Sequence, residues 1–155
     1  MRKYGARIRE GGEVLVLIII VLALIGGGYW YLNLSRRNSE KEAWTFAQEV
    51  AERIASQHDK RFLDLNLSPS AQVALPPSWR DQLFESIRDL GKPDGPIVVT
   101  GKVLFTSHFF EPKGVFRAQI NYPGMLTYLD MSVSAPKGPW CIDALNLVSY
   151  PPRRD

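Results

Sequence analysis

One long stretch without a charged side chain limits the fold more than any other feature of the sequence. It runs from Val14 to Ser35 and reads VLVLIIIVLALIGGGYWYLNLS. At about 1.5 Å rise per residue, roughly 20 apolar residues span the hydrocarbon core of a bilayer. A core helix of a soluble protein would show a polar stripe, and this stretch has none. The pattern predicts a transmembrane helix over residues 14–34, preceded by a basic arm over residues 1–13.

Three adjacent aromatic residues, Tyr29, Trp30 and Tyr31, lie at the C-terminal end of this stretch. Amphipathic rings prefer the headgroup region, so we expect them at the membrane interface. A cleaved signal peptide is the alternative, with an apolar region of about 7–15 residues and small residues before the cleavage site. Gly26, Gly27 and Gly28 could supply the small residues, but the aromatic belt behind them favours a retained anchor.

The orientation of the anchor follows from the basic residues on its two sides. Four precede the stretch and three follow it, namely Arg2, Lys3, Arg7 and Arg9, then Arg36, Arg37 and Lys41. Acidic residues count little in this rule. A short N-terminal arm before a large C-terminal domain is also typical of signal anchors. We therefore expect the N-terminus in the cytoplasm and the domain outside it, on the periplasmic side of a bacterial cell membrane.

A pilin-like helix is a second alternative, because Gly11 and Gly12 stand just before the apolar stretch. Type IV pilins carry a glutamate five residues after the cleaved glycine. Here that position is Leu17, and Glu13 follows Gly12 directly. This departure disfavours the pilin interpretation.

Ala23 and Gly27 form a pair of small residues four positions apart. Such pairs let transmembrane helices pack closely, which would imply a membrane partner or a homodimer. Glycine is also common in membrane helices for no specific reason, and both interpretations stay open.

The part after the anchor is nearly neutral, and its composition excludes several classes of site. The whole chain has 19 basic and 16 acidic residues, and the arm holds much of the excess. No basic patch with interleaved aromatic residues supports nucleic-acid binding. One cysteine and two histidines leave little material for a disulfide or a metal centre. We expect no metal, no cofactor and no nucleic acid.

Helical spacing marks two segments of the domain. After a juxtamembrane linker over residues 35–42, apolar residues recur at helical spacing up to about His58, and Ser39 to Glu42 resembles a capping box. This helix either continues from the membrane span or is separated from it by a break at residues 33–38, and both alternatives stay open. Residues 64–77 have the composition of a loop. A second helix is predicted to begin after Ser78, which would be its N-cap, and to end at Gly91.

After Pro96 the apolar period changes to two, which predicts four antiparallel strands. The clearest alternation covers residues 116–122, and a second covers residues 129–133. Turns are expected at residues 111–114, 123–124 and 136–139. Trp140, Ile142 and Ala144 alternate and the phase then switches to Leu145 and Leu147, which predicts a β-bulge. The sequence thus predicts an α+β fold over residues 43–150, with two helices packed on a four-stranded antiparallel sheet, and a tail over residues 151–155.

This order of elements, with the closing phrase from Lys137 to Asp143, resembles the cystatin-like superfamily, which includes nuclear-transport-factor-2-like domains. The resemblance covers about residues 40–150, although the family's helix between early strands is not evident. It implies a cone-shaped space between sheet and helices. Members of the superfamily include enzymes, ligand binders and assembly modules, so the fold alone does not assign a function.

Enzymes of this superfamily place a His, Asp or Tyr inside the cone. The resemblance therefore implies a short set of residues to consider, namely His108, Tyr122, Tyr128, Asp130 and Asp143. Asp130 falls on the polar alternation of its strand, which predicts a solvent-facing side chain. Cys141 has no electropositive neighbour in sequence that would activate its thiol. These residues do not make up a catalytic set.

Aromatic residues concentrate in the strand half of the domain. Phe109 and Phe110 break the alternation, so one ring is expected to face outward, which hints at a protein interface. The residues predicted to line a pocket or an interface are His108, Phe109, Phe110, Tyr122, Tyr128 and Trp140.

The function expected from these features is that of a non-enzymatic single-pass membrane protein. It would be an accessory or scaffold subunit that binds other membrane-complex subunits or a second copy of itself. A small-molecule binder or isomerase/lyase-like enzyme that uses the cone is the alternative, and a pilin-like assembly subunit is the second alternative.

Overall fold

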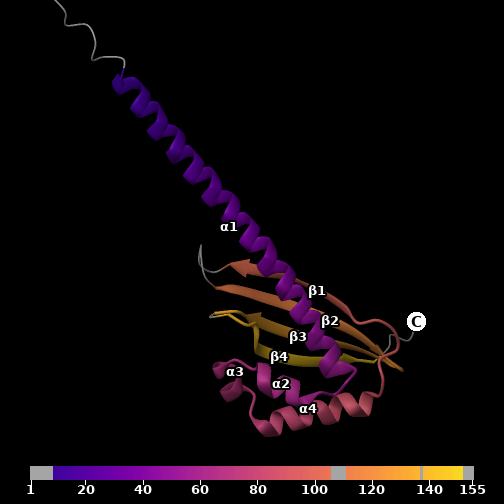
Figure 1. Cartoon of the computed structure of the whole chain (residues 1–155). Coiled ribbons are helices and arrows are strands. Elements are labelled where there is room, and N and C mark those ends of the chain that lie inside the picture. The colour runs from indigo at the N-terminus through magenta and orange to yellow at the C-terminus, as the bar shows by residue number, and fades with distance from the viewer. Residues whose placement is uncertain (1–8, 106–110, 137, 152–155) are drawn as a thin grey trace, which may run out of the picture. The chain divides into compact units, whose positions relative to one another are not determined.

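The computed structural model describes residues 9–105, 111–136 and 138–151, and Figure 1 labels its elements. The chain divides into two compact units, Met1–Ser39 and Glu40–Asp155. The boundary between them falls inside the linker predicted over residues 35–42. Each unit is described by itself below.

A single helix, α1, runs over Arg9–Ala55. Of the two alternatives, continuation from the apolar stretch is therefore confirmed, whereas the break at residues 33–38 and the new helix start at Ser39 are wrong, because residues 33–39 are helical. No proline interrupts this segment, and Arg36, Arg37 and Lys41 have good helix propensity. Adding residues to an existing helix costs far less free energy than starting a new one, so the helix continues.

The apolar stretch of α1 lies within the first unit, and its side chains are almost all exposed. Its most apolar window has a mean hydropathy of 2.4, and none of that window is buried inside the structure. Within the described residues, α1 is the one helix long and apolar enough to cross a membrane. It is compatible with a single transmembrane or signal anchor.

Two short helices occupy most of the segment expected to be a loop over residues 64–77, so that prediction is wrong. They are α2 over Lys60–Asn66 and α3 over Pro69–Ala74. Asp59 caps α2 by accepting from the backbone N–H of Phe62 at 2.9 Å, and Ser68 caps α3 by accepting from Ala71 at 3.3 Å. Pro69 stands at the first turn of α3, where its missing N–H costs nothing.

The helix α4 spans Pro77–Leu90. It begins one residue before the predicted cap, since Pro76 and not Ser78 occupies the N-cap position, and no side chain caps it. It ends as predicted at Gly91, whose φ of 87° is unfavourable for other residues. Leu83 and Ile87 form its buried stripe.

Four strands form one antiparallel sheet in the order β1-β2-β3-β4 (Figure 1). They are β1 Val98–Phe105, β2 Pro112–Tyr122, β3 Met125–Ser134 and β4 Cys141–Tyr150. Helices together with this sheet confirm the predicted α+β class. The turn expected at residues 111–114 is wrong, because Pro112 already pairs with Phe105. The turn at residues 123–124 is confirmed, with Gly124 at φ 76°.

The predicted bulge is present in β4. Ser132 pairs with Ala144, whereas Val133 pairs with Ile142, so Asp143 is an extra residue without an opposite partner. Because of this extra residue, both Ile142 and Leu145 are buried although their positions differ in parity.

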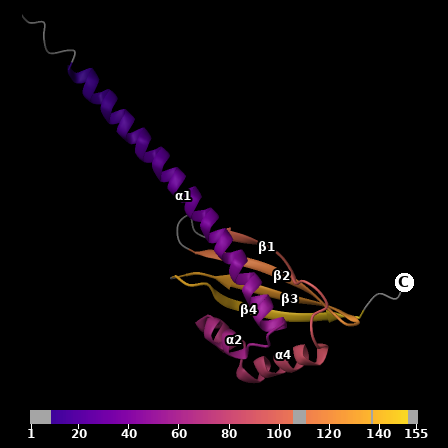
Figure 2. The ribbon, with the colours of Figure 1, turned by 45° about the vertical axis from the view of Figure 1, so that its right-hand side comes forward.

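One cluster of buried apolar side chains forms the core of the second unit. The predicted alternation is confirmed in the two central strands, which bury Phe116, Ala118, Ile120 and Tyr122 from β2 and Leu129, Met131 and Val133 from β3. The last part of α1 adds Ala43, Ala47, Val50, Ala51 and Ile54 to the same cluster. In both ribbon views, α2 and α4 lie on the β4 side of the sheet (Figures 1 and 2).

Candidate functional site

Tyr122, one of the predicted pocket residues, belongs to the core. Its side chain is buried, and its hydroxyl donates to the carbonyl oxygen of Ala55 at 3.4 Å. Burial raises the pKa of Tyr122 to about 12, so the phenol stays protonated at neutral pH. It serves as a packing residue that also links β2 to the end of α1.

Of the other predicted residues, the two that the structure describes, Tyr128 and Trp140, occupy different places. Trp140 is half-buried and packs against the core. Tyr128 lies on the outer face of β3, opposite to the face of the buried Leu129. His108, Phe109 and Phe110 lie outside the described residues, so their predicted role is not addressed by the structure.

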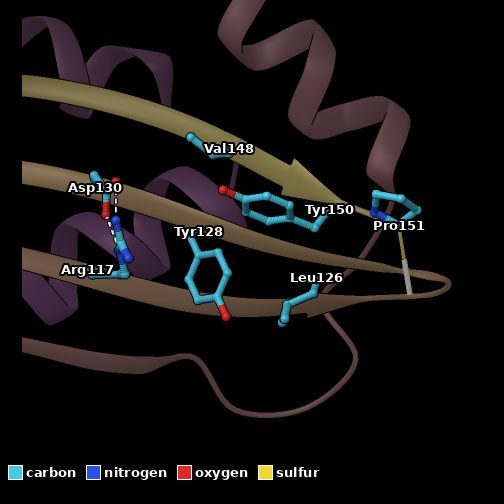
Figure 3. Close-up of a pocket in the computed structure, with 7 residues that line it drawn as sticks. All are labelled: Arg117, Leu126, Tyr128, Asp130, Val148, Tyr150 and Pro151. Atoms are coloured by element: carbon cyan, nitrogen blue, oxygen red, sulfur yellow. Dashed lines mark hydrogen bonds and ion pairs between the residues drawn. The ribbon is translucent and has the colours of Figure 1, made fainter. Parts of the chain in front are cut away.

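Tyr128 instead lines a groove on the outer face of the sheet (Figure 3). The groove has a volume of about 710 Å³ and is lined by Arg117, Leu126, Tyr128, Asp130, Val148, Tyr150 and Pro151. The strand register explains how residues far apart in sequence meet there. Arg117 pairs with Asp130, Tyr128 with Val148, and Leu126 with Tyr150. Directly opposite residues of antiparallel strands share a face of the sheet.

A fork of two hydrogen bonds joins Arg117 to Asp130. Arg117 Nε donates to Oδ1 at 2.5 Å and Nη2 donates to Oδ2 at 2.9 Å. Hydrogen bonding to Asp130, and then its charge, raise the pKa of Arg117. This pair is charge-neutral as a unit, and its geometry is the bidentate form that gives planar specificity.

Arg117 of this pair also contacts one of the two aromatic rings of the groove, and that ring contacts the other. The guanidinium carbon of Arg117 lies 5.3 Å from the ring centroid of Tyr128. The rings of Tyr128 and Tyr150 meet edge to face, with centroids 5.9 Å apart. Arg117, Tyr128 and Tyr150 therefore form a continuous line of contacts with an aromatic surface, and Tyr150 is 53% exposed.

A second hollow of about 560 Å³ continues the groove across the sheet, and it also includes Arg117 and Asp130. Its other lining residues include Thr100 from β1, Val115 from β2 and Asn146 from β4. The outer face thus offers a hollowed surface over all four strands. Val115 on this surface is half exposed.

Two acidic or thiol side chains that the sequence analysis considered can be assessed in the described residues. Both oxygens of Asp130 accept hydrogen bonds from Arg117, so this carboxylate is not a free base. Cys141 is partly buried; burial, and secondarily the charge of Asp143, raise the pKa of its thiol, which keeps it in the less nucleophilic form. No group of three or more His, Cys, Asp or Glu side chains that could hold a metal ion occurs among the described residues.

Asp130 lies on the outer face, as the alternation of its strand predicted, whereas Arg117 and Tyr150 were not among the predicted site residues. The two-residue turn at Pro123 and Gly124 would have identified the first. Such a turn pairs Tyr122 with Met125, and the same register then sets Arg117 opposite Asp130.

No protein-family model, curated protein or solved structure matches this chain. The resemblance to the cystatin-like superfamily therefore stays a prediction.

Proposed function

We propose that this chain is a single-pass membrane protein whose C-terminal domain binds another protein, as an accessory or scaffold subunit of a membrane assembly. In this proposal the N-terminus is cytoplasmic and the domain is extracytoplasmic. Side chains of the helices and of the inner face of the sheet share one buried cluster, which supports a partner on the outer face. The carrying observation is the groove of Tyr128, Tyr150 and the Arg117–Asp130 pair on that outer face.

The exposed apolar helix supports membrane anchoring. Residues 14–31 display Val, Leu, Ile, Trp and Tyr side chains that nothing in the first unit covers. Water would make this exposure very costly, whereas lipid removes the cost. Tyr29, Trp30 and Tyr31 stand at the end of this stretch, as expected of an interface belt.

The helix also has room for a neighbour in the membrane. Ala23 and Gly27 are one turn apart, and a methyl group added at Gly27 would meet no other atom within 4 Å. Close approach of a second helix is the arrangement that small residues allow. We propose that a partner subunit or a second copy packs there.

The composition of the groove supports protein binding. Tyrosine and arginine are enriched at the energetic centres of protein interfaces. Tyrosine supplies a large contact area at a low cost in conformational entropy. Leu126 and Val148 add apolar area beside the two rings.

Membrane anchoring is tested by washing cell envelopes in alkaline carbonate and by fusing a topology reporter after Asp155. We expect the protein to remain in the membrane pellet and the reporter to be active outside the cytoplasm. Release into the supernatant would contradict the anchor, and cytoplasmic reporter activity would contradict the orientation.

Partner binding is tested by purification in mild detergent at native expression. The wild type should elute with a second protein, and Tyr150→Ala should lose it because the ring forms part of the groove. Leu65→Ala is the matched control, since Leu65 is 73% exposed and lies on α2, outside the groove. A wild-type protein that elutes alone as a monomer would contradict the accessory role.

The two alternatives from the sequence remain separate predictions. An enzyme or binder that uses the cone requires a ligand between sheet and helices. A pilin-like subunit requires processing between Gly12 and Glu13, which mass spectrometry of the mature N-terminus detects.

A further inference from the structure

The two edges of the sheet differ in how they are protected. At the β4 edge, Leu67 forms a parallel bridge with Ile142, and the N–H of Ser68 donates to the Ile142 carbonyl at 2.9 Å. The bulge at Asp143 interrupts the same edge. These features are ways in which proteins block unwanted strand pairing.

The β1 edge has none of these protections within the described residues. Its eight residues, VVTGKVLF, include no proline, and the register with β2 has no shift from Val98 to Phe105. No other described strand pairs with it. Lys102 is its only charged residue.

The contacts with β2 show which backbone groups face outward from β1. The carbonyl of Arg117 accepts from Thr100 Oγ1 at 3.3 Å, and the carbonyl of Val115 closely approaches the Cβ position of Gly101. The carbonyls of Val115 and Arg117 thus point toward β1, where Lys102 and Thr100 are their register partners. Because hydrogen-bonded pairs alternate in antiparallel strands, the N–H and C=O groups of Val99, Gly101 and Val103 point away from β2.

We infer that this open edge binds an extended segment of another protein, which adds a fifth strand to the sheet. The backbone of Val99, Gly101 and Val103 would supply the hydrogen bonds, as in other cases of strand addition. Side chains would supply the selectivity. Val98 and Leu104 are each about half exposed on the outer face and favour apolar residues opposite them, and Lys102 between them favours an acidic residue.

This inference rests on the proposed protein-binding role but uses a surface distinct from the groove. The probe is a pair of capped, fluorescently labelled nine-residue peptides of valine and threonine, which differ only in a glutamate or a lysine placed to lie opposite Lys102. They are titrated against the full-length protein in detergent micelles. Fluorescence anisotropy measures affinity, and residue-resolved hydrogen exchange identifies the amides that become protected.

We expect the glutamate peptide to bind about fivefold more tightly than the lysine peptide, as an opposite-charge cross-strand pair allows. The amides of Val99, Gly101 and Val103 should become protected. Lys102→Glu should reverse the preference between the peptides. Lys113→Glu is the matched control, because this substitution makes the same change of charge on β2, away from the open edge.

Val103→Pro removes one outward N–H without removing a bond to β2, and it should weaken both peptides at least tenfold. If this variant fails to fold, as judged by near-ultraviolet circular dichroism, Lys102→Glu still decides the question. The inference is overturned if neither peptide protects these three amides, or if they are already protected in a purified dimer without peptide. Tyr150→Ala should leave peptide binding intact, so a failure of partner binding at the groove can be distinguished from a failure of peptide binding at the β1 edge.

Discussion

Gly101 is opposite Phe116 in the sheet, and the ring of Phe116 occupies the space that a side chain at Gly101 would need. A Cβ at Gly101 would lie 2.5 Å from ring atom Cδ1 of Phe116 and 2.8 Å from the backbone Cα of Phe116. Trp44 meets the same ring edge to face, with centroids 5.0 Å apart, so the ring has little freedom to move aside.

We therefore predict that Gly101→Ala lowers the free energy of unfolding by about 1–3 kcal/mol, as overpacking commonly does. Urea denaturation followed by tryptophan fluorescence measures the change. Thr100→Ala, one residue away on the outer face, is the control and should cost less. Equal stability of Gly101→Ala and the wild type would show that Phe116 is not held in place.

Tyr122 is expected to make the stability of the domain depend on pH in the alkaline range. Its pKa is about 12 in the folded protein because burial disfavours the phenolate, against about 10 in the unfolded chain. The unfolded state therefore loses its proton first, and the stability due to the neutral phenol is lost as pH rises from about 10 to 12.

We predict that the wild type loses more stability than Tyr122→Phe between pH 9 and pH 12, by about 1–2 kcal/mol. Urea denaturation at several pH values measures the difference. Parallel pH profiles of the two proteins would contradict the assignment, since phenylalanine has no proton to lose.

At the scale of the elements, the bulge in β4 determines which side chains enter the core. Deleting Asp143 would force either Ile142 or Leu145 to the outer face, because one residue of shift exchanges the two faces of a strand. We predict a loss of about 3 kcal/mol or more from the exposed side chain and the disturbed pairing. Limited proteolysis and thermal unfolding measure it.

Asp143→Ala is the control for this deletion, since it keeps the extra residue and removes only the carboxylate. It should change stability by less than about 1 kcal/mol. Should the deletion be as mild as the substitution, the bulge would not be what places Ile142 and Leu145 in the core.

The strands were more predictable from sequence than the helices, for a physical reason. Alternation within β2 and β3 reports directly which side chains are buried, because each strand has one face on the core. The continuation of α1 past Ser39 stayed open in the sequence, because a helix already formed needs no cap to continue. The helix α3 was missed and the start of α4 was placed too late because proline was taken as a loop former, whereas Pro69 and Pro77 begin helices.

The candidate site was less predictable still. Its residues come from three strands, so it depends on two registers. The tight turn at residues 123–124 fixes the pairing of β2 with β3, but the bulge shifts the pairing of β3 with β4. Tyr128 was identified, and Tyr150 could be placed beside it only when that second register was known.

At the scale of the whole molecule, the proposed orientation in the membrane depends on a small difference between the numbers of basic residues on the two sides of the apolar stretch. Four basic residues precede the apolar stretch and three follow it. We predict that the double variant Arg7→Gln, Arg9→Gln inverts a measurable fraction of the molecules, because basic residues set orientation. A pair of reporters after Asp155, one active in the cytoplasm and one outside it, measures the ratio.

The control for this prediction is Glu10→Gln, Glu13→Gln, which changes the net charge of the arm by two units in the opposite direction. It should leave the ratio unchanged, since acidic residues contribute little to the rule. A shift of similar size in the opposite direction, toward more molecules with a cytoplasmic N-terminus, would show that net charge, and not basic residues, directs insertion.

Because α1 continues past Ser39 into the core, its alanine-rich face from Ala43 to Ala55 is the first part of the domain to be synthesised. The strands that complete the cluster emerge from the ribosome last. That face of the nascent helix therefore stays uncovered until the strands that complete the cluster, up to Ile142 and Leu145 of β4, have been added. A soluble truncation intended for biophysical work should accordingly begin no later than Glu40.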